Sequence, residues 1–326
     1  MKAVIITRPG GSEVLELQDR PAPEPGAGQI RVRVRASALN RADVLQRQGN
    51  YPVPPGYSAE IAGMEYAGEV DAVGSGASLW KKGDGVMGIV GGAGHAELLT
   101  VHEREAMPVP AGMSWENAAA IPEAFLTAYD ALFNRLDLQM GETLLIHAVA
   151  SGVGTAATQI ARTVGAKVVG TSRSPEKLER VKPLGLDIGI DTSAGDWPTQ
   201  VEGALGGQHV NAVMDLVGGN YLEGNLRVLA LRARIVIVGL TAGATAPLNM
   251  GWMLRKRATI VGTTLRARPL EEKISLAREF SNRIIPLFAA GTLQPVVDRV
   301  LPFSEIRAAH DLMESNRTFG KVVLSW

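Results

Sequence analysis

The middle of the chain contains the run Leu144-Leu145-Ile146-His147-Ala148-Val149-Ala150-Ser151-Gly152-Val153-Gly154-Thr155-Ala156-Ala157. It has the pattern of a buried apolar strand, a turn of small residues and the start of a helix. Small residues let a backbone approach a pyrophosphate closely, and a helix N-terminus offers N–H groups and a partial positive charge. The run therefore predicts a dinucleotide-binding turn, although a helix start of small residues can also serve packing alone.

The glycine fingerprint of such turns, G-x-G-x-x-G, is incomplete in this chain. Ala150, Gly152 and Thr155 occupy its three positions, with Gly154 as a glycine in altered spacing. The prediction depends instead on a context of alternating strands and helices, which indicates an α/β domain with a parallel sheet. We expect strands at 144–148, 167–171, 210–216, 234–240 and 259–263, and helices at 154–164, 175–182 and 221–229.

The residues before about 120 have a different pattern. Many glycines and prolines interrupt short apolar runs, and residues 30–36 alternate apolar and basic side chains, as a strand buried on one face does. This part predicts a small β-rich domain. Ser114 is a plausible N-cap for the helix that follows it. Toward the C-terminus we expect a long helix from 270 to about 290, a strand at 296–301, a helix at 304–315 and a strand at 321–324.

Composition narrows the function classes further. The chain has 326 residues, enough for about two domains. Its 33 basic and 33 acidic residues cancel, so nothing favours nucleic acid or an anionic membrane, and the basic run 254–257 is expected to be a solvated turn. Cysteine is absent, which excludes disulfides, thiolate catalysis and Cys-ligated zinc. Neither the four apolar residues near the N-terminus nor the uncharged run 143–161 fits a signal peptide or membrane span, so we expect a cytoplasmic protein.

The residues after the second expected strand bear on the choice of cofactor. An NAD site places Asp or Glu at the end of this strand for the ribose hydroxyls. Here the strand at 167–171 continues into Ser172-Arg173-Ser174, and Lys177 follows one turn into the next helix. Two cations and two hydroxyls suit a 2′-phosphate, which favours NADPH over NADH. The alternative is an exposed helix start with solvated charges.

Several motifs occur together along the whole chain. They are Ser37-Ala38-Leu39-Asn40-Arg41-Ala42-Asp43, Gln46-Arg47-Gln48-Gly49-Asn50-Tyr51, Ala119-Ala120-Ile121-Pro122-Glu123 with Leu126-Thr127-Ala128, and the turn at 151–157. In this combination the chain resembles the zinc-free quinone oxidoreductases, the zeta-crystallin relatives of the medium-chain dehydrogenase/reductase superfamily. Among them it is most similar to the tumour-suppressor-inducible branch.

The resemblance implies a Rossmann parallel-sheet domain plus a β-rich GroES-like domain. The domain limits are then 1–122 for the GroES-like part, 123–265 for the Rossmann NADPH-binding domain and 266–326 for a return to the catalytic domain. It also implies NADPH as cofactor, a homodimer paired through the Rossmann sheet edge, and reduction of quinones or other electron-poor carbonyl compounds.

Site residues carried over by position divide by the part of the cofactor that they would contact. Asn40 and Thr127 would approach the nicotinamide and its ribose, and Gly239, Leu240 and Leu265 would line the nicotinamide side. Phe319 would close over the cofactor. Thr192 stands where relatives often have Tyr, which weakens an adenine-side contact there. The pyrophosphate would be held by Ser151, Gly152, Val153 and Gly154, and the 2′-phosphate by Ser172, Arg173, Ser174 and Lys177.

Zinc-dependent relatives in the same superfamily carry a Gly-His-Glu motif, where this chain has Gly63-Met64-Glu65. The five histidines are scattered singly, so we expect no metal site and interpret each histidine as a structural or surface residue. Without a metal Lewis acid, an acceptor with an already activated carbonyl is the better substrate. The hypothesis is direct hydride transfer, with the protein positioning two rings.

Candidate catalytic residues follow from this hypothesis. Tyr51 is the first choice for contacting the substrate oxygen, with packing against Pro52, Pro54 and Pro55 as the alternative. Asn40 and Asp43 are expected on one helix face, Asn40 as a hydrogen-bonding partner of cofactor and substrate and Asp43 as a cap or ion-pair residue. Glu123 is either a helix-terminal acid or a site residue. Two other functions stay open: an enoyl or enone reductase, and a non-catalytic NADPH-binding protein.

Overall fold

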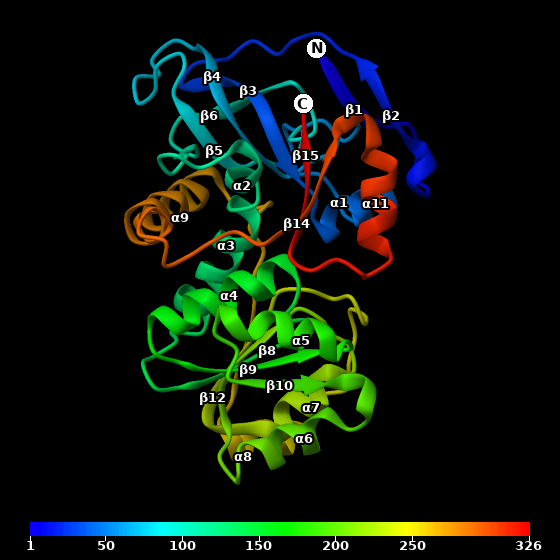
Figure 1. Ribbon diagram of the computed structural model, residues 1–326, viewed down its shortest axis with the longest axis vertical. Helices are drawn as coiled ribbons and strands as arrows, with labels where there is room; N and C mark the ends of the chain where they lie inside the picture. Colours follow the sequence, from blue (N-terminus) through cyan, green and yellow to red (C-terminus); the bar gives the residue numbers. More distant parts are fainter. The chain divides into compact units, whose positions relative to one another are not determined.

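The computed structural model describes residues 1–326 and divides them into two units. Unit 1 comprises Met1–Leu126 and Leu265–Trp326, and unit 2 comprises Thr127–Thr264. Both termini therefore belong to unit 1 (Figure 1). The domain limits expected at 122 and 265 stay a prediction.

Unit 2 contains a parallel sheet, as the alternating sequence pattern predicted, but the sheet has six strands, because β10 adds to the five that were expected. Its strand order is β10-β9-β8-β11-β12-β13, so the chain first builds outward from β8 on one side and then on the other. The order reverses between β8 and β11, the position at which open α/β sheets bind ligands. The strands are β8 (Thr143–Ile146), β9 (Lys167–Ser172), β10 (Ile188–Asp191), β11 (Val210–Asp215), β12 (Leu229–Ile237) and β13 (Thr259–Gly262).

Helices pack around this sheet, in green to yellow in Figure 1. Fully buried Leu145, Val169, Val213 and Ile235 form the centre of the core between strands and helices. The basic run 254–257 is the end of a helix and not a turn, because Arg257 adopts the left-handed conformation that closes α8. The helices are α4 (Gly152–Thr163), α5 (Pro175–Val181), α6 (Trp197–Ala204), α7 (Tyr221–Val228) and α8 (Met250–Lys256), with the π-helix η2 (Asp130–Arg135) and the 3-10 turns η3 (Lys182–Leu184) and η4 (Thr192–Ala194).

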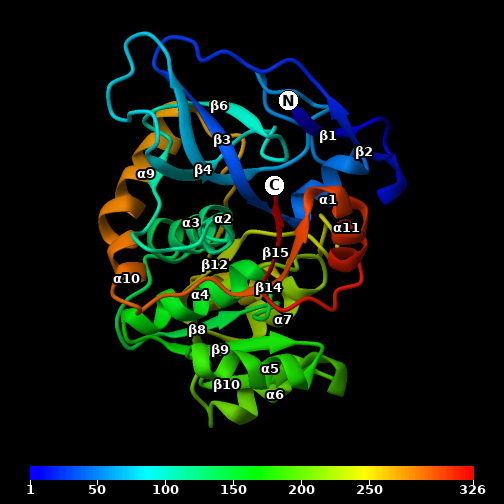
Figure 2. The ribbon, with the colours of Figure 1, turned by 45° about the horizontal axis from the view of Figure 1, so that its top comes forward.

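Unit 1 is the predicted β-rich unit. Its main sheet has the order β14-β15-β3-β4-β5-β7, β6 pairs with β3, and β1 and β2 form a separate pair. β15 comes from the C-terminus and lies antiparallel beside β3, red next to blue in Figure 2. The strands are β1 (Lys2–Ile6), β2 (Leu15–Asp19), β3 (Gln29–Ala38), β4 (Glu65–Val73), β5 (Gly85–Ile89), β6 (Leu98–His102), β7 (Met107–Pro108), β14 (Val297–Pro302) and β15 (Lys321–Ser325).

The alternation expected in β3 is confirmed. Ile30, Val32 and Val34 are buried on one face, while the arginines between them face outward. Arg31 and Arg33 form ion pairs with Asp71 of the neighbouring strand β4 at 2.8 and 2.9 Å. Cross-strand charge pairs of this kind stabilise one strand register over another.

The helices of unit 1 include one correction. The single helix expected from 270 to about 290 is wrong, because Pro286 lacks an N–H donor and the chain begins a new helix around it. Ser114 is confirmed as the N-cap of α2, since its Oγ accepts a hydrogen bond from the Asn117 N–H. No helix of the chain is long and apolar enough to cross a membrane. The helices are α1 (Arg41–Arg47), α2 (Trp115–Ala119), α3 (Pro122–Tyr129, which continues into unit 2), α9 (Leu270–Arg283), α10 (Ile285–Ala289) and α11 (Ile306–Glu314), with turns η1 (Ser12–Val14) and η5 (Phe303–Glu305).

Candidate functional site

The turn between β8 and α4 forms a cradle of backbone N–H donors. Ser151 is the N-cap of α4, and its Oγ accepts a hydrogen bond from the Gly154 N–H at 3.1 Å. Gly152 and Val153 occupy the first turn, where N–H groups have no partner within a helix. A Cβ on Gly154 would lie 2.6 Å from the carbonyl oxygens of Ala148 and Val149, so only glycine fits there. This cradle has the donors and the close backbone approach that a pyrophosphate requires.

A buried polar network supports the cradle from beneath. His147, the residue before the turn, contacts Thr171 Oγ1 at 2.9 Å through Nδ1 and Asn225 Oδ1 at 2.6 Å through Nε2. Asn225 Nδ2 donates to Asp215 Oδ2 at 2.8 Å, so Asn225 Oδ1 is the acceptor and His147 Nε2 carries the proton. Burial lowers the pKa of His147, which is consistent with this neutral form.

The same network fixes the end of β11. Asp215 Oδ1 accepts hydrogen bonds from the N–H groups of Val217 and Gly218, both at 2.8 Å. The network therefore joins the carboxyl ends of β8, β9 and β11, where the cradle sits. The interpretation of His147 as structural agrees with this placement. The roles of Asn225 and Asp215 were not predicted, because several strands and helices separate both residues from His147 in the sequence.

The residues proposed for a 2′-phosphate lie together after β9. Ser174 is the N-cap of α5 and accepts a hydrogen bond from the Lys177 N–H, while Ser172 Oγ accepts one from the Ser174 N–H at 3.1 Å. Arg173 is exposed, and β9 ends on Ser172 and not on Asp or Glu; the first acid after it is Glu176 in the first turn of α5. Two hydroxyls, two cations and a helix N-terminus give this turn the chemistry of a phosphate site.

The remaining cofactor-side residues of unit 2 are more scattered. β12 ends at Ile237 and not at 240 as expected, so Gly239 and Leu240 lie in the loop after the strand. Leu240 is 52% exposed and lines a pocket of about 400 Å³ together with Gly218, Gly219 and Ile237. Thr127 is buried in α3 at 6% exposure, and Thr192 begins the turn η4 that Asp191 caps.

In unit 1, Asn40 forms a buried, hydrogen-bonded triad with Lys321 and Glu65. Lys321 Nζ donates to Asn40 Oδ1 at 2.5 Å and to Glu65 Oε1 at 2.7 Å, and Asn40 Nδ2 donates to the same Glu65 oxygen at 2.8 Å. Lys321 and Glu65 are almost fully buried, with side chains 5% and 0% exposed. Both ends of the Asn40 amide are therefore held by charged partners. Neither Lys321 nor Glu65 was assigned a role from the sequence.

The placement of Asn40 corrects one expectation. Asn40 and Asp43 do not share a helix face, because Asn40 precedes α1 as its N-cap in an extended conformation. The Asn40 N–H donates to Asp43 Oδ2 at 2.8 Å. Of the two roles expected for Asp43, helix cap or ion-pair residue, the structure therefore shows the cap. Burial raises the pKa of Asp43 to about 6, and Asp43 Oδ1 has no hydrogen-bond partner.

Glu65 also organises the start of α3. Its Oε2 accepts a hydrogen bond from the Glu123 N–H at 2.8 Å, and Glu123 Oε2 lies 3.9 Å from Lys321 Nζ. Glu123 is thus a helix-terminal acid close to the triad. Met64, at the position of a zinc-ligating His in metal-dependent relatives, is buried. Nowhere in the chain do three or more His, Cys, Asp or Glu side chains form a group suited to a metal ion.

Tyr51 lies beneath a guanidinium group. The Arg266 Cζ atom is 5.2 Å from the centre of the Tyr51 ring, within the range of a cation–π contact. Burial raises the pKa of the half-buried Tyr51 hydroxyl, while Arg266 acts in the opposite direction. Tyr51 is therefore a neutral phenol with an O–H to donate. Arg266 was missed from the sequence, in which nothing connects it to residue 51.

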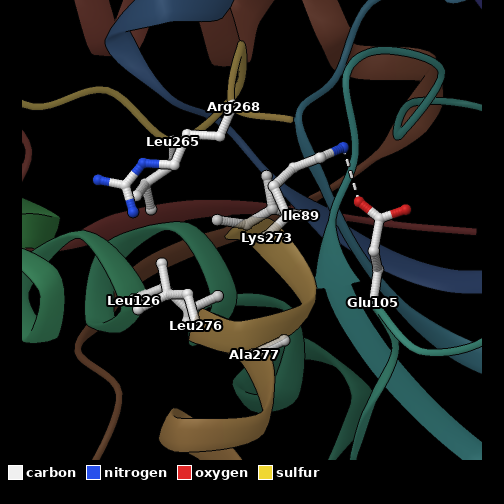
Figure 3. A pocket seen from close by; sticks show the side chains of 8 residues that line it. All are labelled: Ile89, Glu105, Leu126, Leu265, Arg268, Lys273, Leu276 and Ala277. Atoms are coloured by element: carbon white, nitrogen blue, oxygen red, sulfur yellow. Dashed lines mark ion pairs between the residues drawn. The ribbon is translucent and has the colours of Figure 1, made fainter. Parts of the chain in front are cut away.

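Leu265 and Phe319 complete the predicted set. Leu265 lines a cavity of about 20 Å³ in unit 1, with Ile89, Leu126, Leu276 and Ala277 around it and the Lys273–Glu105 ion pair at its rim (Figure 3). A cavity of this size admits about one water and no aromatic ring. Phe319 is buried at 6% exposure, and its N–H donates to Asp298 Oδ1.

Comparisons with known proteins agree with both units. Residues 152–282 match the family profile of zinc-binding dehydrogenases, and residues 26–111 match the GroES-like domain of alcohol dehydrogenases. The human synaptic vesicle membrane protein VAT-1 homolog is 33% identical, over 99% of this chain and 86% of its own. A quinone oxidoreductase of Pseudomonas aeruginosa is 33% identical, over 97% and 96% of the two chains.

Solved structures give the same result. Escherichia coli quinone oxidoreductase complexed with NADPH superimposes with a TM-score of 0.90 at 29% identity, over 100% of both chains. The JamJ enoyl reductase superimposes with a TM-score of 0.88 at 26% identity, over 99% and 98% of the chains. The GroES-like unit and the parallel-sheet unit expected from the sequence are therefore confirmed.

Proposed function

Because the chain belongs to the medium-chain dehydrogenase/reductase superfamily, with quinone oxidoreductases and VAT-1 homologues among its relatives, we propose that it is an NADPH-dependent, zinc-independent reductase of quinones or related activated carbonyl compounds. The observation that carries the proposal is the α4 cradle followed by Arg173 and Lys177 after β9. A place in the tumour-suppressor-inducible branch is part of the same proposal.

The cofactor assignment rests on how the residues of unit 2 fit the group. The Gly152 and Val153 N–H groups, with Ser151 and Gly154, would hold the pyrophosphate, and Arg173, Lys177, Ser172 and Ser174 the 2′-phosphate. When bound, the nicotinamide ring supplies a hydride. Thr127, Gly239, Leu240 and Leu265 are proposed for its ring and ribose side, Asn40 and Phe319 for positioning, and Thr192 for the adenine side.

The proposed acceptor chemistry uses the residues of unit 1. The hydride carries two electrons and one proton to a carbon of the acceptor, and an electron pair moves onto the carbonyl oxygen. Tyr51 donates its O–H to that oxygen, and a proton from solvent completes the reduced product. Asn40, held by Lys321 and Glu65, keeps the adjoining backbone in place. Positioning of this kind is the largest contribution that such a site makes.

Zinc independence is proposed from the residues present. A catalytic zinc needs about three N, O or S ligands, and the chain has no cysteine and has Met64 at the ligand position. Glu65, the nearest acid in the sequence, is already bound by Lys321 and Asn40. A ligand set would have to break this triad.

A homodimer through the open sheet edge is also part of the proposal. β13 is an outer strand of the sheet, with one side unpaired. Leu248, Met250 and Leu254, near it in sequence, are 42%, 74% and 77% exposed. Exposed apolar residues and an unpaired strand edge are features that a second copy would cover. A cytoplasmic location is proposed with it.

Absorbance of NADPH tests the function directly. Purified protein is assayed with 1,2-quinones, 1,4-quinones and α,β-unsaturated ketones and thioesters. Saturable turnover of a quinone supports the proposal. Turnover of enones alone favours the enoyl reductase alternative, which the similarity to JamJ supports. NADPH binding without turnover of any acceptor would contradict the proposal and indicate a non-catalytic NADPH-binding protein.

A further inference from the structure

Arg266 is a buried guanidinium with an incomplete set of hydrogen bonds. Its Nε donates to the Gly91 carbonyl oxygen at 2.8 Å, and its Nη2 donates to Gln46 Oε1 at 2.7 Å. The residue is only 2% exposed, yet Nη1 has no hydrogen-bond partner. The side chain is therefore fixed in orientation while one nitrogen, with two N–H bonds, is left over.

Such an arrangement is costly unless a ligand completes it. A buried donor loses its hydrogen bonds to water on folding, and this desolvation free energy is recovered only when the donor bonds to an acceptor. The cost is greater for a charged group. Burial lowers the pKa of Arg266, whereas Asp43 and Tyr51 act in the opposite direction. Asp43 attracts the guanidinium through space, but it forms no hydrogen bond with it.

The surroundings of Arg266 indicate which ligand fits. Its guanidinium lies over the ring of Tyr51, with Cζ 5.2 Å from the ring centre, so the cation and the phenol belong to one cluster. The cavity beside Leu265, at about 20 Å³, is not lined by Arg266 and is too small for a ring. A planar guanidinium donates best to an oxygen that carries negative charge.

We propose that Arg266 is a catalytic residue that binds the carbonyl oxygen of the acceptor through Nη1. This inference rests on the proposed function and deepens it. As the electron pair from the hydride collects on the carbonyl oxygen, the fixed guanidinium stabilises the resulting oxyanion. Arg266 keeps its own protons, and solvent supplies the proton that completes the product. A fixed donor aimed at a developing charge costs no rearrangement during the reaction.

The test compares Arg266→Met with Arg266→Lys and with a matched control, Arg278→Met, on the exposed side of α9. kcat/KM is measured with 1,4-naphthoquinone, and Kd is measured for NADPH and, separately, for 2,4-dinitrophenolate as an oxyanion probe. Arg266→Met is expected to lower kcat/KM by about 10- to 100-fold and to weaken dinitrophenolate about tenfold, the range for a charge-assisted hydrogen bond. NADPH affinity and the control should stay within about twofold of wild type.

Three outcomes would overturn the proposal. They are a kcat/KM of Arg266→Met within about threefold of wild type, an equal loss of NADPH affinity, or full activity in Arg266→Lys, which keeps the charge and loses the fork. If Arg266→Met does not fold, the kcat/KM of Arg266→Lys decides instead, and a value within about threefold of wild type overturns the proposal. If wild type reduces no quinone, the proposed function fails, and dinitrophenolate binding still decides the role of Arg266.

Discussion

Lys321 of β15 and Glu65 of β4 form a buried ion pair at 2.7 Å, although 256 positions separate them in the sequence. Asn40 bridges the two side chains, so the pair connects the N-terminal and C-terminal segments of unit 1. The pair thereby fixes the residue before α1 and, through the Glu123 N–H, the start of α3.

Removing one partner of this pair should be far more harmful than removing both. Lys321→Met leaves the Glu65 carboxylate buried without a counter-charge, and we expect the free energy of unfolding to fall by about 3–5 kcal/mol. Adding Glu65→Gln should restore a substantial part of this loss. Urea denaturation of the two single variants and the double variant measures the coupling. A loss below about 1 kcal/mol in Lys321→Met would contradict the structural role given to the pair.

Gly154 should tolerate no side chain. The methyl group of Gly154→Ala would meet two backbone oxygens at 2.6 Å, so the helix start must move away from the strand. We expect a loss of about 1–3 kcal/mol in stability and at least about a tenfold weaker NADPH complex. Gly203→Ala in α6 is the matched control, because nothing lies within 4 Å of its Cβ position. Equal behaviour of the two variants in fluorescence titrations with NADPH would show that the cradle is misplaced.

Arg173 and Lys177 should distinguish the two nicotinamide cofactors. Arg173→Ala with Lys177→Ala removes two cations from the turn after β9 and leaves the Ser174 cap in place. NADPH affinity should fall by about 10- to 100-fold, because charge-assisted hydrogen bonds to the 2′-phosphate are lost, while NADH affinity changes little. Calorimetric titration with each cofactor measures both. A parallel loss for NADH and NADPH would overturn the 2′-phosphate assignment.

His95 and Asp43 should act in opposite directions on acid stability. Burial lowers the pKa of His95 from 6.5 to about 4. Between these pH values the unfolded chain binds a proton at His95 and the folded chain does not, so the free energy of unfolding falls as pH drops from 6.5 toward 4. Burial raises the pKa of Asp43 from 3.8 to about 6, so the folded chain binds the proton at a higher pH than the unfolded chain does. The contribution of Asp43 to the free energy of unfolding therefore rises as pH drops from 6 toward 3.8.

Single variants separate these two terms. His95→Leu should lose less stability than wild type between pH 7 and pH 5, and Asp43→Asn should lose more. Denaturant midpoints at the two pH values measure the differences, each about 1–3 kcal/mol from the size of the shifts. Identical pH profiles for wild type and both variants would contradict the assigned protonation states.

The sequence predicted the elements whose signals are local. The strand, small-residue turn and helix around Ser151 were found because capping, glycine and apolar periodicity all occur within a few residues. The alternation of β3 and the cap at Ser114 were recognised for the same reason. β10, a strand of four residues containing Gly189, was missed because it has too few apolar residues to show a period.

The most informative side chains of the site were not predictable in this way. Arg266 meets Gln46 across 220 positions, and Lys321 meets Glu65 across 256. A single sequence carries no signal for such pairs, because Arg266 and Lys321 alone resemble ordinary surface cations. Only folding shows that Arg266 and Lys321 are both buried and that Nη1 of Arg266 has no hydrogen-bond partner.

Initial rates of NADPH oxidation with a 1,2- or 1,4-quinone test the proposed reaction, measured beside the same rates with NADH. We predict a saturable rate that is proportional to protein concentration and at least about tenfold faster, in kcat/KM, with NADPH than with NADH, as expected for a charge-assisted 2′-phosphate contact. A rate that never exceeds that of buffer with any quinone would contradict the account.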